Sequence, residues 1–197
     1  MYPQFPARRS TVHVALFVDV RNAAEVRARI VKAAGMVGAE GDEEREAVNF
    51  AFVDARLITS VLHLRTAIYQ AVLAELQGAL RTKTVHSEIL WILNPSNNIT
   101  EAIRRYGVGD DSRALLVVRV AAAELSAPDV EAKMRAVVQG DLVSLDRLQE
   151  ITDWAAVKKY HKMGADPAVK KAADSAAERA VVDNIATTSV AMKSVAT

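Results

Sequence analysis

Residues 11–20 read TVHVALFVDV, and this stretch gives the clearest indication of the fold. It is rich in β-branched and apolar residues, which is typical of a buried β-strand. Working outward, similar apolar runs predict further strands at Phe50–Val53, Val85–Leu93 (VHSEILWIL) and Ala114–Val120. These four segments predict a β-sheet.

Between and after these strands the apolar residues recur at helical spacing. Asn22, Asn98 with Glu101, and Asp153 stand where helix caps are expected. The predicted helices are Ala23–Ala34, Thr59–Gln77, Ile99–Tyr106, Asp129–Gln139, Trp154–Lys162 and Ala168–Met192. Strands interleaved with helices predict a mixed α/β (α+β) fold, with a small, mostly antiparallel sheet covered by helices and a helical C-terminal third.

The 197 residues are enough for one domain, so we expect residues 1–197 to form a single domain. Residues 35–46 contain three glycines and the acidic run GDEERE. This composition predicts a mobile acidic surface insertion that is dispensable for folding.

The composition excludes several classes of protein. Hydrophobic residues make up 51% and charged residues 25%, which excludes wholesale disorder. No apolar run reaches the roughly 20 residues that span a bilayer, and Met1–Pro6 lacks the build of a secretory signal, so no membrane partner is expected. The absence of cysteine excludes disulfides and thiolate chemistry, and favours a reducing compartment. The net charge of +1 means that any nucleic-acid role must rest on local clustering of basic residues.

No pattern in the sequence predicts a catalytic residue, a metal or a cofactor. The four histidines lack metal-ligand spacing. His86 and Ser87 are adjacent on a predicted strand, where neighbouring side chains point to opposite faces, so they form no nucleophile–base pair. Gly107 and Gly109 follow a helix and precede a strand, whereas a dinucleotide-binding fingerprint needs the reverse order.

Basic residues cluster in three places: Arg81 with Lys83, Arg104 with Arg105, and residues 158–162, which contain three lysines. On spacing alone, a solvated surface is the simpler interpretation of such clusters.

The last predicted helix has an unusually wide apolar face. One stripe runs through Ala177, Val181, Ile185, Thr188, Met192 and Val195, and the alanines at 173, 176, 180 and 191 broaden it. Burial against the chain's own core accounts for part of this face. The remaining width leaves a second apolar surface for a partner.

Two motifs carry a resemblance to a known family. Arg81–Leu90 (RTKTVHSEIL) and Asn94–Ile103 (NPSNNITEAI) resemble the small PRPK-binding (TPRKB-type) subunit of the KEOPS/EKC complex. Phe17–Asn22 and Phe50–Asp54 match it as well, and the resemblance extends over roughly residues 5–193. The sequence departs from the family at Ala55, at Tyr106 and in the 35–46 insertion. The loop length and the Phe50–Phe52 match look fungal.

The resemblance implies a non-catalytic subunit without cofactors. Such a subunit binds a small PRPK-type atypical kinase/ATPase, and through it contacts indirectly the threonylcarbamoyl-transferase subunit. It also helps to recruit tRNA by the 3′ CCA end for threonylcarbamoyladenosine formation next to the anticodon. The complex is linked to telomere maintenance, and we expect it in the nucleus and cytoplasm.

Together, the resemblance and the residue patterns assign two sets of site residues. The predicted kinase-binding residues are Ala173, Ala176, Ala180, Val181 and Ile185. The predicted RNA-binding residues are Arg81, Lys83, Arg104, Arg105 and Tyr106, with Tyr106, and more weakly Trp91, as candidates for stacking on bases. The alternative is a small-molecule-binding domain or enzyme with a pocket that the sequence does not reveal.

Overall fold

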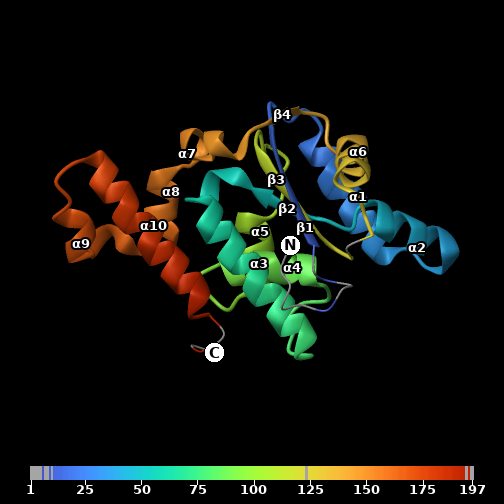
Figure 1. The fold of residues 1–197 in the computed structure, drawn as a ribbon, viewed down its shortest axis with the longest axis horizontal. Helices are drawn as coiled ribbons and strands as arrows, with labels where there is room; N and C mark the ends of the chain where they lie inside the picture. The colour runs from blue at the N-terminus through green and yellow to red at the C-terminus, as the bar shows by residue number, and fades with distance from the viewer. Residues whose placement is uncertain (1–5, 7–8, 10, 123, 194, 196–197) are drawn as a thin grey trace. The chain divides into compact units, whose positions relative to one another are not determined.

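The computed structural model describes residues 6, 9, 11–122, 124–193 and 195 (Figure 1). Residues 1–5, on which the absence of a secretory signal was predicted, lie outside the described part. The chain divides into two compact units: residues up to 54 together with 107–144, and residues 55–106 together with 145–197. The single-domain expectation is not tested by this division and stays a prediction.

The first unit contains a four-stranded sheet with the order β2-β3-β1-β4. The strands are β1 (Thr11–Val18), β2 (Ala51–Asp54), β3 (Leu115–Ala121) and β4 (Asp141–Val143). All three pairings are antiparallel; in the register of β1 with β3, Leu16 lies opposite Leu116. The prediction from residues 11–20 is confirmed, although β4 was not foreseen. Its three residues are too short to show an alternating pattern.

Two helices cover one face of this sheet, α1 (Ala23–Gly35) and α6 (Ala127–Val137) (Figure 1). The shared core contains side chains of alternate strand positions and of both helices: Ala15, Phe17, Phe52, Leu115, Val117, Val26, Ala33, Val130, Met134 and Val137. The predicted side-chain cap of α1 by Asn22 is wrong. The Asn22 amide group instead donates to Val137 O at 2.9 Å and accepts from Gln139 N at 2.9 Å, which ties the start of α1 to the end of α6.

The acidic segment 35–46 is not a loop, and that part of its prediction is wrong. Residues Gly38–Ala47 form helix α2. Arginines outside the helix neutralise its carboxylates: Arg29 bonds Glu44 through two hydrogen bonds of 2.5 and 3.0 Å, and Arg119 of β3 bonds Glu46 at 2.5 Å. The run of like charge therefore has partners distant in sequence, which the local pattern does not reveal.

The second unit is built from helices. Its elements are η2 (Ala55–Leu57), α3 (Val61–Leu76), α4 (Val85–Leu93), α5 (Ile99–Tyr106), η3 (Leu145–Arg147), α7 (Leu148–Ile151), α8 (Trp154–Tyr160), η4 (Met163–Ala165), α9 (Pro167–Lys170) and α10 (Ser175–Ala191). The mixed α/β class, the antiparallel sheet and the helical C-terminal third are confirmed. Among the described helices, none is both long enough and apolar enough to cross a membrane.

The segment Val85–Leu93 is helix α4, so its prediction as a strand is wrong. Thr84 and Ser87 form a capping box at its start, with Ser87 N donating to Thr84 Oγ1 at 3.1 Å. Eight of its nine residues are buried, so the segment has no polar face. A helix buried on all sides shows the same continuous apolar run as a buried strand, which is why periodicity failed here.

The predicted final helix, residues 168–192, is two helices. Asp166 caps α9 by accepting from Ala168 N at 2.8 Å, and α9 ends at Lys170. Asp174 then starts α10 by accepting from Ala177 N at 2.8 Å. A second Asp cap inside the alanine-rich stretch therefore divides it.

Candidate functional site

Helix α10 packs against α3, and the two helices are also linked by hydrogen bonds. Its buried face consists of Val182, Ala186 and Val190, spaced by four residues. Thr59, just before α3, donates to Asp183 at 2.6 Å, and the Gln70 side chain donates to Ala191 O at 3.2 Å. The core of this unit thus uses one stripe of α10.

The predicted kinase-binding residues lie outside that buried stripe. Ala176 and Ala180 are exposed on α10, and Val181 and Ile185 are half-buried beside the core face. Ala173 is exposed but precedes the helix. The wide apolar face is therefore only partly taken up by the core, and contact of its remainder with a kinase stays a prediction.

The predicted RNA-binding residues fall into different environments. Arg81, Lys83 and Arg104 are exposed. Arg105 is not free: its side chain is 19% exposed, pairs with Glu101 at 2.5 Å and lies 4.4 Å from the centroid of the Tyr160 ring.

Base stacking on Tyr106 is a prediction that the structure overturns. Tyr106 is 1% exposed, and burial raises the pKa of its hydroxyl. Its Oη lies 3.2 Å from His161 Nε2, next to α8. Trp91 is also unsuited to stacking, because it is 6% exposed and its Nε1 donates to Asn97 O at 3.3 Å. Aromatic rings inside the core leave no face for a base.

A buried polar cluster connects α3 to α8, and sequence reasoning did not find it. His63 is fully buried, with Nδ1 3.0 Å from Thr59 Oγ1, and its ring centroid is 6.4 Å from that of His161. Burial, with a smaller contribution from the nearby His161, lowers the pKa of His63 to about 3. Burial lowers the pKa of His161 to about 4. Both imidazoles are therefore neutral at neutral pH.

The Arg-Thr-Lys-Thr segment before α4 is held by a carboxylate that was not singled out. Glu88 is 1% exposed and accepts from the backbone N–H groups of Arg81 (3.0 Å) and Thr82 (2.8 Å) and from the Thr82 hydroxyl (2.7 Å). A glutamate four residues after a capping Thr would have been the signal, had α4 been recognised as a helix. The segment carrying Arg81 and Lys83 is thus anchored.

The turn between α4 and α5 is held from the C-terminal end of the chain. The Lys193 ammonium donates to Asn94 O and Ser96 O, both at 2.7 Å, and lies 4.6 Å from the centroid of the Trp91 ring. Burial lowers the pKa of Lys193 to about 8. Asn98 caps α5 as predicted, accepting from Glu101 N at 2.9 Å.

Side chains that serve metal binding or nucleophilic catalysis elsewhere have structural roles here. The Ser87 hydroxyl is bonded to Thr84 O at 3.0 Å and Thr82 Oγ1 at 2.9 Å, in the cap of a helix rather than on a strand. Within the described residues, no group of three or more histidines or carboxylates is placed to hold a metal ion.

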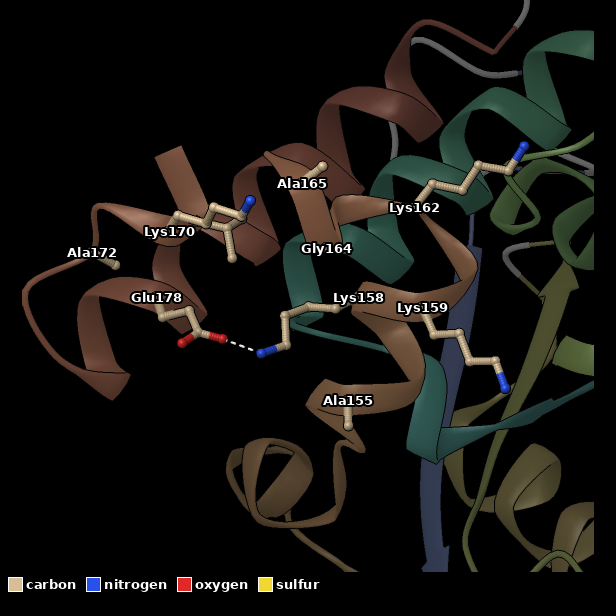
Figure 2. A pocket seen from close by; sticks show the side chains of 10 residues that line it. Ala155, Lys158, Lys159, Lys162, Gly164, Ala165, Lys170, Ala172 and Glu178 are labelled. Carbon is tan, nitrogen blue, oxygen red and sulfur yellow. Dashed lines mark hydrogen bonds and ion pairs between the residues drawn. The ribbon is translucent and has the colours of Figure 1, made fainter. Parts of the chain in front are cut away.

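A basic pocket of about 740 Å³ opens among α8, η4, α9 and the first turn of α10 (Figure 2). Its lining includes Lys158, Lys159, Lys162 and Lys170, together with Glu178. Lys158 and Glu178 form an ion pair. Three of these lysines were noted as a basic cluster in the sequence, and the fold adds Lys170.

These features describe a mixed α/β protein with an antiparallel sheet, whose exposed features are a partly free helix face and basic surfaces. A family model described as "Kinase binding protein CGI-121" matches residues 17–193, so the chain belongs to this family. The resemblance seen in the sequence is confirmed.

Fungal proteins named "EKC/KEOPS complex subunit CGI121" are similar over most of their length. The one from Cryptococcus neoformans is 35% identical over 204 residues, covering 87% of this chain and 89% of its own. The Aspergillus fumigatus protein is 33% identical over 156 residues (78% and 77%), and the Neurospora crassa protein is 32% identical over 200 residues (92% and 91%).

Proposed function

We propose that the chain is a non-catalytic subunit of an EKC/KEOPS complex that binds the small PRPK-type kinase of that complex. Membership of the kinase-binding family and the names of the fungal relatives support the proposal. The structural observation that carries it is the division of α10. Its core stripe is Val182, Ala186 and Val190, while Val181 and Ile185 stay half-buried and Ala180 exposed. An apolar helix face that the core does not fill suits a partner helix or sheet.

The proposal extends to tRNA and to the wider complex. The subunit helps to recruit tRNA through its 3′ CCA end, so that threonylcarbamoyladenosine forms next to the anticodon, and contacts the transferase subunit only through the kinase. The same complex acts in telomere maintenance, in the nucleus and cytoplasm. Exposed Arg81, Lys83 and Arg104 support an RNA contact, because such side chains reach phosphates.

Kinase docking is tested by replacing Ile185 with Asp. A charge inside a desolvated contact costs several kcal/mol, so Ile185→Asp should abolish co-purification with the kinase at a 1:1 ratio. The matched control is Ile103→Asp on α5, where the isoleucine is 50% exposed. Circular dichroism must show that both variants are folded. A folded Ile185→Asp protein that binds the kinase like wild type would refute α10 as the docking face.

The RNA contact is tested with the pair Arg81→Glu and Arg104→Glu. Removal of one phosphate contact should flatten the plot of log affinity against log salt by roughly 0.7 to 0.9. The control pair, Arg21→Glu and Arg113→Glu, makes the same charge change at exposed sites of the other unit. Equal weakening of tRNA binding by both pairs would show that only net charge matters.

A further inference from the structure

The pocket among α8, η4, α9 and α10 contains basic groups that have no ion-pair partner. Of its four lysines, Lys158 pairs with Glu178. Within the described part of the chain, no ion pair is found for Lys159, Lys162 or Lys170. Ion pairing is common for arginines elsewhere in this chain, as in Arg29–Glu44, Arg119–Glu46 and Arg135–Glu131. The pocket therefore concentrates unpaired positive charge, although the whole chain has a net charge of only +1.

The backbone of this region is bent to form the hollow. Lys162 has φ 57° and ψ 33°, the left-handed conformation, which a non-glycine residue adopts at a cost of roughly 1–2 kcal/mol. This bend turns the chain from α8 into η4, so that α9 returns beside α10. Gly164 then lies at the pocket with no atom within 4 Å of where a Cβ would be. A strained residue beside an open hollow is more often found at binding sites than elsewhere.

The lining indicates which kind of ligand fits. Besides the charged residues it consists of small or aliphatic ones: Ala155, Gly164, Ala165, Val169 and Ala172. No aromatic ring is among the described residues that line the pocket, so there is no platform on which a base would stack. Lysine ammonium groups bind phosphate oxygens as point charges. Electrostatic attraction is therefore the main source of affinity, and the ligand is a multivalent anion.

The positions of the lysines favour an extended anion over a single phosphate. Figure 2 shows the Lys158 ammonium directed at Glu178, with Lys170 of α9 on the same side of the pocket. Lys159 and Lys162 extend to the other side in the same view. A volume of about 740 Å³ is in the range of small-ligand pockets and exceeds what one phosphate needs. A chain of linked phosphates reaches both sides of the hollow.

We infer that this pocket binds a polyphosphate-type anion, with Lys158, Lys159, Lys162 and Lys170 as its ligands. Glu178 competes with that anion for Lys158, because its carboxylate occupies the place where a phosphate oxygen would pair. This site is distinct from the docking face on α10 and from the RNA contact at Arg81 and Arg104, and it needs neither of them.

The test is calorimetric titration of the full chain with inorganic triphosphate at low salt. We expect saturable binding at one site and at least tenfold weaker binding of orthophosphate. The double variant Lys162→Ser/Lys170→Ser should weaken triphosphate binding at least tenfold. The control Lys32→Ser/Lys133→Ser removes the same charge from exposed positions of the other unit and should change it less than twofold.

Glu178 provides an independent arm with the opposite sign. Glu178→Gln frees Lys158 and should tighten triphosphate binding at least threefold. Glu131→Gln, which frees the ion-paired Arg135 on α6, should leave it unchanged. Absence of saturable binding, or equal effects of the pocket and control variants, would overturn the inference. Tighter binding of a ten-nucleotide RNA that triphosphate fails to displace would also overturn it, and would make the pocket an RNA contact.

Discussion

Replacement of the buried His63 should remove a defined part of the acid sensitivity of this protein. His63 is fully buried in the second unit, and burial lowers its pKa from 6.5 to about 3. In the unfolded chain the imidazole takes up a proton near pH 6.5, whereas in the folded chain it stays neutral down to about pH 3. The unfolded state therefore binds more protons between these values, so the free energy of unfolding falls as pH falls through that window.

The size of the effect follows from the two pKa values. Between pH 7.5 and 5.5 only the unfolded form of His63 titrates, which costs about 1.4 kcal/mol of stability. His161, with a pKa lowered to about 4, adds a similar amount over the same interval. His63→Gln should therefore lose about 1.4 kcal/mol less than wild type between the two pH values, whatever its absolute stability. The double variant with His161→Gln should lose about 2.7 kcal/mol less.

Urea unfolding at pH 7.5 and 5.5, followed by tryptophan fluorescence, measures this difference. Trp91 and Trp154 both belong to the same unit as the two histidines, so the signal reports on the relevant part of the chain. Carboxylates contribute equally to wild type and variants, and their effect cancels in the comparison. An identical loss of stability in wild type and His63→Gln would refute the reasoning, because it would mean that His63 is protonated in the folded state.

Three further changes have expected outcomes in thermal and urea unfolding. Glu88→Gln should cost roughly 1–3 kcal/mol, because a neutral amide is a weaker acceptor for the N–H groups before α4; unchanged stability would contradict this. Lys193→Met leaves two carbonyl oxygens without their charged donor and should cost roughly 2–4 kcal/mol; Lys170→Met, at an exposed position, is its control. Deletion of residues 36–45, predicted from sequence to be harmless, should instead lower the melting temperature by at least about 3 °C, because it removes most of α2; a melting temperature equal to that of wild type would restore the loop interpretation.

Local sequence patterns predicted those elements of the fold whose two faces differ or whose ends are marked. Strands β1 and β3 stand out as β-branched runs, and Asn98 and Asp153 cap α5 and α8 at the expected residues. Segment 85–93 was misassigned because burial on all sides removes the periodicity that separates helix from strand. Helix α2 was missed because its carboxylates are neutralised by Arg29 and Arg119, which are distant in sequence.

The candidate surfaces were predicted unevenly for a related reason. The apolar width of α10 is visible in the sequence, but which stripe enters the core depends on packing against α3. Burial of Tyr106 and engagement of Arg105 by Glu101 both depend on how the helices fold and pack. Composition alone did not separate these two residues from the exposed Arg104.

The sequence by itself determined the class of fold, the resemblance to the kinase-binding subunit and the lack of thiol chemistry, because these depend on residue types and on patterns within one segment. Only the tertiary structure decided which basic groups are free and which are paired. Lys158, Lys162 and Lys170 come from successive short elements, and it is the left-handed turn at Lys162 that folds those elements around one hollow. Charge becomes a site only where the fold brings like charges together without partners, and that arrangement depends on distances in space that residue spacing does not encode.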